Sequence, residues 1–521
     1  MTAILVPGLT CASLFEDAHA GVLVDGRDFY KQLYEACCAA ERSIFMLGWQ
    51  FDSKVALLRG DDAKGCEHPT ELVEFLRDLC EKRPELEIYM LAWDASAVFA
   101  FEREPLQKLR FRTRGHKRLH YRMDNAHPPG ASHHQKLVVV DRSVAFLGGM
   151  DVCNARWDDR SHEAEAPHRC SGHRPYAPYH DVQAYVTGEA VDVLRQWFCD
   201  RWLLATEQDI CIEDAPVREL SITPSIDVDA PVVALTRTLP RMEEPTCPAV
   251  SEIYDLHARA IMEAERVIYI ENQYFSCDEI ADWFVRRMER GGSPLDIVVV
   301  LPEKSAGWKE RISIGVYQQR ILEKLGAVAA RTGHHVGVYH TAASGPDGDV
   351  PVFIHAKVLA VDDRFLLVSS ANLSNRSMGF DSELGLAWEA SEPTPSLANA
   401  RIDLLAEHCG LSGESARAML ADSHGLVDRL DAIARAKTHR LRMHRRNADE
   451  KAGWLLSKIL PEDTPLDPDD PRVIEEMLPE PGAWFDRFFR DPFIVTRRAV
   501  RGPMRSMRRR LGRARQRSLP R

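Results

Sequence analysis

The sequence lacks several features that mark specialised classes of protein. Its twelve cysteines are scattered over 521 residues without a C-x-x-C pair, which supports neither a zinc site nor a disulfide framework. No apolar run approaches the roughly 20 residues of a membrane-spanning helix. The mildly apolar start lacks the basic segment of a secretory signal, and Glu16 and Asp17 follow it. We therefore expect a cytoplasmic protein with reduced thiols and no bound metal or other cofactor.

The net charge is unevenly distributed along the chain, because acidic residues outnumber basic ones over residues 1–496 but not in the C-terminal stretch. The formal net charge is −11, although residues 497–521 hold eleven arginines and no acid, so residues 1–496 carry −22. Because phosphate contacts dominate nucleic-acid affinity, an acidic body disfavours a nucleic-acid partner. The tail either is solvated and disordered or rests on anionic lipid head groups, which would make the protein peripheral on the inner face of the membrane.

An internal repeat is present along the chain. Residues 41–51 resemble residues 265–275, and each copy follows an amphipathic segment with helical spacing of apolar residues, at 29–40 and 253–264. A second buried-looking strand follows each copy, at 86–91 and at 295–301. A repeated order of helix, strand, helix and strand predicts an α/β fold.

Each copy of the repeat carries an H-x-K-x4-D element, and the two elements are offset by 221 residues. They consist of His134, Lys136 and Asp141, and of His355, Lys357 and Asp362. The strand period of two places His and Lys of each element on one face. Each aspartate precedes another apolar run, which is typical of a hairpin turn, so we expect the aspartates to orient and brace rather than react.

These residue types suit phosphoryl transfer. One neutral imidazole can attack phosphorus and form a covalent intermediate, and a second, protonated imidazole can protonate the leaving alcohol. Two lysines would stabilise the negative charge of the transition state. Hydrogen bonds to the phosphate could come from Ser370, Asn372 and Asn375. Since each copy has one such histidine, both copies must form a single site.

An acid follows each element at the head of another strand-like run. These acids are Asp181 and Glu383. A carboxylate that binds Nδ1 of a histidine fixes its tautomer and supports the imidazolium, so we expect the two acids to serve His134 and His355.

Four segments follow from this pattern. We predict two similar α/β lobes at 15–225 and 226–395 with the active site between them, a helical and proline-rich extension at 396–496, and the arginine-rich tail at 497–521. Four further histidines lie between the two elements: His162, His168, His173 and His180. We assign them to a variable loop over the active site rather than to a metal site.

The two elements and their surroundings resemble the phospholipase D superfamily with its duplicated HKD motif, and most closely bacterial phospholipase D proper. The matching stretches are 148–151, 156–158 with His162, 270–275 and 369–377. The resemblance implies lobes with a mixed sheet flanked by helices. It also implies that His134 is the nucleophile and His355 the general acid, that Glu383 stands behind His134 and Asp181 behind His355, and that no metal is required.

The resemblance implies a phospholipase D that hydrolyses a glycerophospholipid with water or exchanges its head group with an alcohol. Asp151 stands where many members have Asn, so one phosphate donor is lost there; phospholipase D proper often has this Asp. The alternatives are a phosphatidyltransferase of cardiolipin-synthase type, a nuclease, which the acidic body disfavours, and a non-catalytic membrane scaffold, against which both complete elements argue.

Overall fold

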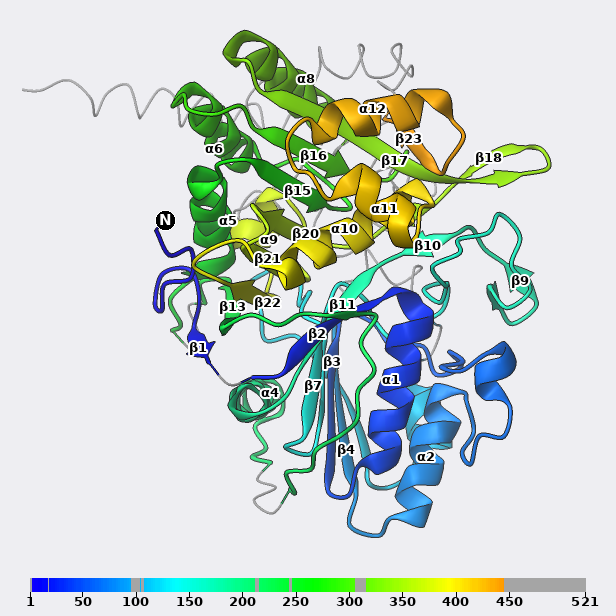
Figure 1. Cartoon of the computed structure of the whole chain (residues 1–521). Helices are drawn as coiled ribbons and strands as arrows, with labels where there is room; N and C mark the ends of the chain where they lie inside the picture. Colours follow the sequence, from blue (N-terminus) through cyan, green and yellow to red (C-terminus); the bar gives the residue numbers. More distant parts are fainter. Residues whose placement is uncertain are drawn as a thin grey trace, which may run out of the picture.

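The computed structural model describes residues 2–16, 18–94, 104, 107–210, 215–242, 246–304 and 315–444. The tail predicted at 497–521 and the extension beyond residue 444 lie outside the described residues. Two α/β lobes stand next to each other, the first below and the second above in Figure 1, which confirms the predicted fold class. Within the described ranges, no helix has the length and apolar character needed to cross a membrane.

An eight-stranded sheet forms the centre of the first lobe. Its strands lie in the order β12 (Ile226–Asp227), β2 (Ala20–Val24), β11 (Val182–Val186), β7 (Val144–Gly148), β6 (Leu137–Val140), β3 (Ser43–Gly48), β4 (Glu87–Trp93) and β5 (Leu119–Asp124). One face packs against α1 (Asp25–Ala39), α2 (Leu72–Lys82) and α3 (Gln107–Arg114). The other face packs against α4 (Glu189–Thr206), where the rings of Phe198 and Phe45 stack with centroids 4.6 Å apart.

An eleven-stranded sheet forms the centre of the second lobe. Its main path is β1 (Ser13–Phe15), β13 (Val232–Leu239), β22 (Glu383–Glu389), β21 (Phe365–Ser369), β20 (Val358–Val361), β15 (Val267–Glu271), β16 (Asp296–Val300), β17 (His335–Gly345) and β18 (Gly348–Pro351). Two further strands, β14 (Val250–Ser251) and β23 (Leu441–Met443), pair with β13 and β17. The helices on its two faces are α5 (Glu252–Glu263), α6 (Asp278–Glu289) and α8 (Gly315–Thr332) on one, and α10 (Pro395–Cys409), α11 (Gly413–Leu420) and α12 (Leu426–Ala436) on the other.

The internal repeat is a repeat of sheet topology. The order β2, β11, β7, β6, β3, β4, β5 in the first sheet matches the order β13, β22, β21, β20, β15, β16, β17 in the second. The helices predicted at 29–40 and 253–264 are confirmed as parts of α1 and α5. Asp141 and Asp362 lie at the turns of the hairpins β6–β7 and β20–β21, with φ of 50° and 54°, as the apolar pattern predicts.

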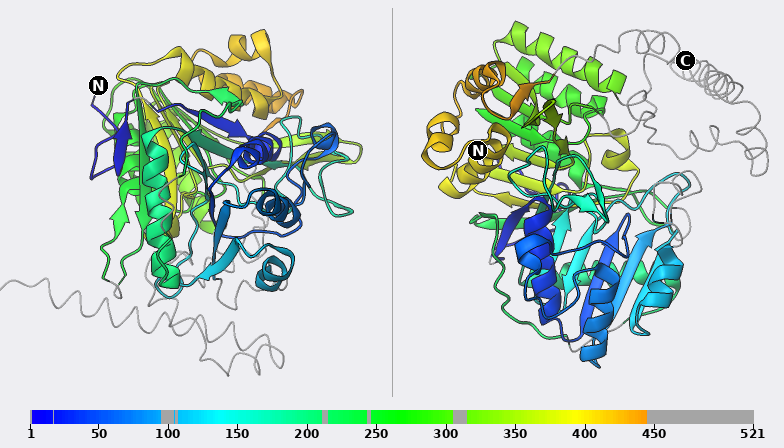
Figure 2. Two further views of the ribbon diagram at one scale, coloured as in Figure 1. Left: turned by 90° about the horizontal axis from the view of Figure 1, so that it is seen from below. Right: turned by 90° about the vertical axis from the view of Figure 1, so that its right-hand side faces the viewer.

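The lobes share one apolar core. β7 and β11 lie against β21 and β22, and one continuous cluster of buried side chains includes residues of both sheets, α4 and α10 to α12. Figure 2 shows the two layers of strands side by side in its left view. A short parallel pair, β10 (Tyr179–His180) with β19 (Phe353–Ile354), joins the lobes directly. The remaining short elements are η1 (Gly60–Ala63), β8 (Cys170–Ser171), β9 (Arg174–Pro175) and α9 (Asn375–Gly379).

Strand pairing differs from the predicted boundaries in three places. β12, at 226–227, pairs with β2 of the first lobe, whereas the boundary was placed before residue 226. β1, at the N-terminus, pairs with β13 of the second lobe. The extension is not separate, because β23 completes the sheet of the second lobe beside β17. Each difference arises from a pairing partner that is distant in the chain, which local patterns do not reveal.

Candidate active site

His134 precedes β6 and faces an acid of the second lobe. Its Nδ1 lies 3.0 Å from Oε2 of Glu383, the first residue of β22. The backbone helps to hold this position, because the N–H of His134 donates to the carbonyl of Ser382 at 2.9 Å. The carboxylate of Glu383 is fully buried, whereas the side chain of His134 is 18% exposed. With Nδ1 bound to the acid, Nε2 is the nitrogen available for chemistry.

His355 precedes β20 and repeats this arrangement with the lobes exchanged. Its Nδ1 lies 2.6 Å from Oδ2 of Asp181, which directly precedes β11 of the first lobe. Its backbone N–H donates to the carbonyl of His180 at 2.8 Å. We call His134 with Glu383 and His355 with Asp181 the cross-lobe pairs. Each lobe therefore supplies one histidine and the acid that orients the histidine of the other lobe.

The charges around His355 show that both lobes contribute to one site. Burial, followed by the positive charges of Lys357, Arg156, Lys136 and His134, holds the pKa of His355 well below 6.5. Lys136 and His134 belong to the first lobe, so their effect reaches across the interface. In the ligand-free site the imidazole of His355 is therefore neutral.

The two lysines have different partners. Nζ of Lys136 lies 3.2 Å from Oδ2 of Asp151, while Nζ of Lys357 donates to Oε1 of Gln273 at 3.4 Å. Burial lowers the pKa of Lys357 to about 7, although the charge of Asp181 opposes this shift. Asp151 also accepts from the backbone N–H of Trp49 at 2.8 Å, so it acts as an acceptor inside the protein. Lys357 thus remains without a carboxylate partner among the described residues.

Asp141 and Asp362 do not face the histidines. The carboxylate of Asp141 accepts from the backbone N–H groups of residues 41, 42 and 43 at 2.8, 3.0 and 2.7 Å. Asp362 accepts from residues 265, 266 and 267 at 2.6, 2.8 and 2.9 Å. Both aspartates therefore connect the hairpin turn after each histidine to the start of the neighbouring strand, β3 or β15, and their geometry is that of a brace.

One of the three predicted phosphate donors has another role. The hydroxyl of Ser370 is fully buried, donates to Oε2 of Glu383 and accepts from the N–H of Leu384 at 3.0 Å. Ser370 is thus directed to the supporting acid rather than to a phosphate, because a hydroxyl has a single proton to donate. Asn372 is buried, and its Oδ1 has no hydrogen-bond partner among the described residues. Asn375 begins α9.

Arg156 is a cation of the site that the sequence pattern did not single out. Its guanidinium lies 4.9 Å over the ring of Tyr179, and that ring lies 5.5 Å from the ring of His355. Its Nε is buried without a hydrogen-bond partner, and no carboxylate of the described residues forms an ion pair with it. The signal in the sequence was its place in the stretch 156–158, which carries the family resemblance.

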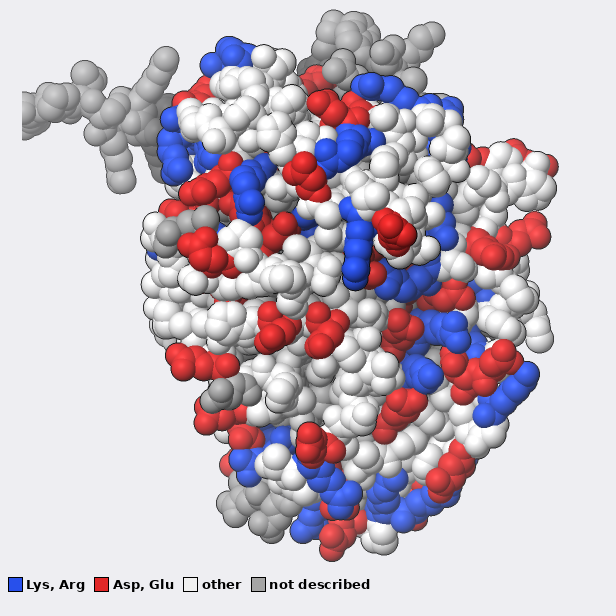
Figure 3. Space-filling view, viewed as in Figure 1, with Lys and Arg blue, Asp and Glu red and all other residues white. Residues whose placement is uncertain are grey.

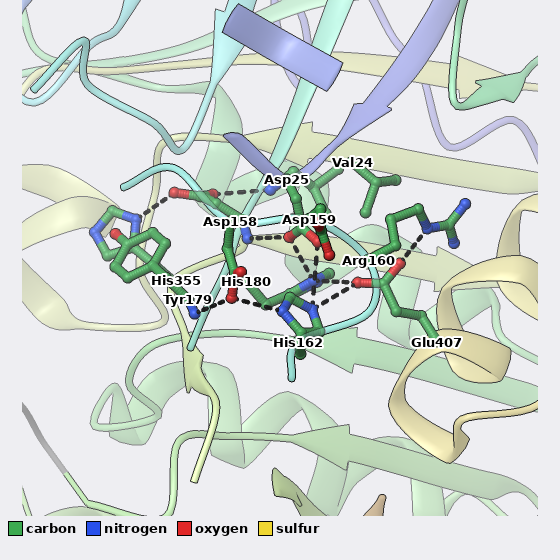
Figure 4. A network of polar contacts seen from close by, with 12 residues as sticks. Val24, Asp25, Asp158, Asp159, Arg160, His162, Tyr179, His180, His355 and Glu407 are labelled. Carbon is green, nitrogen blue, oxygen red and sulfur yellow. Dashed lines mark hydrogen bonds and ion pairs between the residues drawn. The ribbon is translucent and has the colours of Figure 1, made fainter. Parts of the chain in front are cut away.

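The histidines assigned to a variable loop fall into two groups. His162 and His180 are fully buried between the lobes, which corrects their assignment to a loop over the active site, while His168 and His173 are exposed. The buried pair lies among acids of the first lobe and Glu407 of α10, as Figure 4 shows, and Nε2 of His180 also faces Glu271 of the second lobe. Buried histidines need hydrogen-bond partners. The partners of His162 and His180 come from distant parts of the chain, so the local sequence did not predict their burial.

Two family models match the chain. The model described as phospholipase D matches residues 36–288, and the one described as cardiolipin synthase, PLD-like domain, matches residues 258–400. Phospholipase D alpha 4 of Arabidopsis thaliana is 23% identical over 76% of this chain and 66% of its own length. Bovine phospholipase D2 is 27% identical over 51% of this chain and 39% of its own. The chain thus spans less than two thirds of these relatives.

Among solved structures, phosphatidylserine synthase of Haemophilus influenzae Rd KW20 is similar, with a TM-score of 0.48, 13% identity and coverage of 80% of this chain and 93% of that one. Fold and site together define a class of duplicated α/β proteins in which two lobes share one site with a histidine, a lysine and an orienting acid from each. Together with the family models, they show that the chain belongs to the phospholipase D superfamily.

Proposed function

We propose that this protein is a phospholipase D, which hydrolyses the head-group phosphodiester of glycerophospholipids or exchanges the head group with an alcohol. The observation that carries the proposal is the presence of two cross-lobe pairs, at His134 and His355, in one site. Two oriented imidazoles meet the need of a double displacement, in which one attacks while the other handles the proton.

In the first step, Nε2 of His134 forms a bond to phosphorus while the bond from phosphorus to the head-group oxygen breaks. His355 gives its proton to that oxygen, so the head group leaves as an alcohol rather than as an alkoxide. The buried carboxylate of Glu383 supports the positive charge that His134 acquires, as an acid on the opposite ring nitrogen does in other nucleophile systems.

In the second step, neutral His355 takes a proton from water or an alcohol, whose oxygen attacks phosphorus and breaks the bond to His134. Water gives phosphatidic acid, and an alcohol gives a new phospholipid. The first step requires protonated His355, although burial, together with the neighbouring cations, holds its pKa well below 6.5. A bound phosphodiester brings a negative charge that offsets these cations, so substrate binding raises this pKa towards neutrality.

The cations of the site suit the non-bridging oxygens of the phosphodiester. Lys357 and Arg156 have no carboxylate partner among the described residues, in contrast to Lys136 beside Asp151. Positive groups with open hydrogen-bond capacity bind the charge that develops in the transition state. We assign the side-chain amide of Asn372 to the same oxygens.

The proposal is tested by incubating the protein with vesicles of phosphatidylcholine, phosphatidylethanolamine and phosphatidylglycerol, with and without a primary alcohol, and analysing the lipids. We expect phosphatidic acid without the alcohol and the exchanged lipid with it. Absence of both products with all three lipids contradicts the proposal. A variant with His134→Ala serves as the inactive control.

A phosphatidyltransferase of cardiolipin-synthase type is the second candidate, favoured by the family model that matches residues 258–400. It differs in the acceptor, because the hydroxyl of a second lipid replaces water. With phosphatidylglycerol as the only lipid, it would release glycerol and form cardiolipin. A nuclease is disfavoured, since acidic and basic side chains are intermingled over the face in Figure 3 rather than gathered into a basic band.

A further inference from the structure

Four side chains from three parts of the chain converge at a buried point between the lobes. They are Asp25 at the start of α1, His162, His180 of β10 and Glu407 of α10, which we call the interlobe cluster. One ligand atom from each lies within 4.8 Å of all the others. All four residues are buried, with Asp25, His162 and His180 at 0% exposure.

The inner nitrogens of both histidines face carboxylates. Nε2 of His162 lies 3.3 Å from Oδ2 of Asp25 and 3.0 Å from Oε1 of Glu407. Nδ1 of His180 lies 3.1 Å from Oδ1 of Asp25 and 2.8 Å from the same Oε1 of Glu407. Figure 4 shows these contacts converging between Asp25 and Glu407.

The outer nitrogens also face carboxylates. Nδ1 of His162 lies 3.0 Å from Asp158, and Nε2 of His180 lies 2.7 Å from Glu271. A neutral imidazole has one N–H and one lone pair, so with the N–H directed outward the lone pair would point at the inner carboxylates. Such a contact is repulsive unless positive charge lies in front of the inner nitrogen.

The charge balance of the cluster also favours a positive charge in front of the inner nitrogens of the two histidines. Asp158 has one guanidinium partner, Arg169 at 3.0 Å, and Glu407 has another, Arg160 at 2.5 Å. When the histidines are neutral, the four buried carboxylates of Asp25, Asp158, Glu271 and Glu407 carry two negative charges more than the two guanidinium groups. Arg160 is also shared with Asp403 at 2.5 Å, and Nε2 of His408 lies 3.3 Å from Glu271. Since unpaired buried charge is costly, a doubly positive occupant would balance the four buried carboxylates.

We propose that the interlobe cluster binds one divalent transition-metal ion, with Zn²⁺ as the first choice, through the inner nitrogens of His162 and His180 and the carboxylates of Asp25 and Glu407. Zinc takes four such ligands at about 2.0–2.2 Å, which places ligand atoms roughly 3.3 Å apart in a tetrahedron. The four nitrogen-to-oxygen separations of 2.8 to 3.3 Å are close to this value, with Asp25 facing His162 through Oδ2 and His180 through Oδ1. The mixed nitrogen and oxygen set disfavours Ca²⁺ and Mg²⁺, which prefer oxygen.

Three further observations support a metal ion. Oδ2 of Asp25 is fully buried, has no hydrogen-bond partner among the described residues and points into the cluster. The outer N–H groups would donate to Asp158 and Glu271, the arrangement in which carboxylates orient metal-bound histidines. The alternative occupant, two protons, would make two imidazolium rings with centroids 5.6 Å apart repel each other in a buried site.

The position gives the ion a structural role. Asp25 and Asp181 exchange backbone contacts, since the N–H of Asp25 donates to the carbonyl of Asp181 at 2.8 Å, and Oδ1 of Asp25 accepts from the N–H of Asp181 at 3.2 Å. Asp181 orients His355. An ion in the interlobe cluster would thus join α1, β10 and α10 directly behind one cross-lobe pair.

The test measures metal content by mass spectrometry in the full chain, produced without an affinity tag in zinc-supplemented medium. We expect one zinc ion per chain in the unmodified protein, none in His162→Gln, and one in His173→Gln, a control that replaces an exposed histidine of the same segment. Equal zinc in His162→Gln and the unmodified chain overturns the proposal, as does a folded, metal-free unmodified chain.

A second measurement avoids the risk that His162→Gln does not fold. The unmodified chain, produced in cobalt-supplemented medium, should show the visible d–d absorption of four-coordinate Co²⁺ and a higher melting temperature than a chelator-treated sample. Nitrogen NMR that finds His162 and His180 both doubly protonated, with no cobalt bound, identifies two protons as the occupant and overturns the proposal. Neither readout depends on phospholipase activity.

Discussion

Nδ1 of His355 lies 2.6 Å from Oδ2 of Asp181, although 174 residues separate them in the chain. The contact crosses the lobe interface, and its counterpart between His134 and Glu383 crosses it in the opposite direction. Neither lobe therefore holds a histidine together with its own orienting acid. A small shift of one lobe against the other would change both pairs at once.

The coupling within a cross-lobe pair predicts the result of a double-mutant cycle. Asp181→Asn should lower kcat by roughly 10²-fold, because the neutral amide no longer supports the imidazolium. Once His355→Gln has removed the ring, adding Asp181→Asn should change little more. Steady-state kinetics of the single and double variants measure this, with exposed Asp61→Asn as the control. Independent effects that multiply would show that Asp181 acts elsewhere.

The proposed intermediate predicts a covalent phosphohistidine. After brief incubation with a lipid labelled in its phosphate and alkaline quenching, we expect the label on the peptide that contains His134. His355→Asn should slow both the appearance and the loss of the label, because the same ring protonates the leaving head group and activates water. Label on the peptide of His355 would reverse the two roles, which the low pKa of that ring in the free site makes a real alternative.

The bracing aspartates predict a loss of stability rather than of chemistry. Asp141→Asn and Asp362→Asn each replace a carboxylate that accepts three backbone N–H groups with a neutral amide, which accepts them less strongly. We expect each to cost about 2 kcal/mol or more, the range for hydrogen bonds to a charged group. Urea unfolding measures the loss, while kcat per folded molecule should stay nearly unchanged. A strong fall in kcat at full stability would contradict the bracing role.

Arg156 predicts a substitution series that separates charge from packing. Arg156→Met should lower kcat/KM by roughly 10- to 100-fold, the worth of one charge-assisted hydrogen bond to the phosphate. Arg156→Lys keeps the charge and should recover part of the loss. Equal effects of both variants, accompanied by a lower melting temperature, would instead assign Arg156 to packing on Tyr179.

Burial of His257 on α5 predicts an acid-sensitive contribution to stability. Burial lowers the pKa of His257 to about 4, while its Nδ1 contacts the carbonyl of Ile253 at 2.7 Å. Between pH 6.5 and 4 the unfolded chain therefore binds a proton that the folded chain does not. Stability is fully present above pH 6.5 and falls by up to about 1.4 kcal/mol per pH unit below it.

His257→Gln keeps a donor for the Ile253 carbonyl but does not titrate. Urea unfolding at pH 7, 6 and 5 should show a smaller decline for this variant than for the unmodified chain. Parallel declines would place the acid sensitivity in other groups.

The sequence was sufficient for the features that repeat. The offset of 221 residues between the H-x-K-x4-D elements and the strand-like runs around them predicted two lobes of one topology, and the common strand order confirms this. Hairpin turns at Asp141 and Asp362 were also predictable, because a turn is specified by residues next to one another in the chain.

The features that depend on distant partners were not predictable. Ser370 has the residue type of a phosphate donor, but its hydroxyl donates to the carboxylate of Glu383 on the next strand. His162 and His180 lie in a stretch of loop composition, but they are buried against Glu407 of α10 and Glu271 of β15 in the second lobe. Local sequence patterns reveal neither partner, because both contacts form only when the two lobes pack together.

β1 pairs with β13, and the N–H of Ile4 donates to Oε1 of Glu389 at 2.6 Å across 385 positions of the chain. During synthesis the segment around Ile4 therefore leaves the ribosome long before β13 and Glu389, and it can dock only after they have been made. Its docking is an event of high contact order and comes late in folding. The segment before β2 therefore docks onto a second lobe that has already folded. In a chain that ends before residue 389, this segment would lack its contact with Glu389.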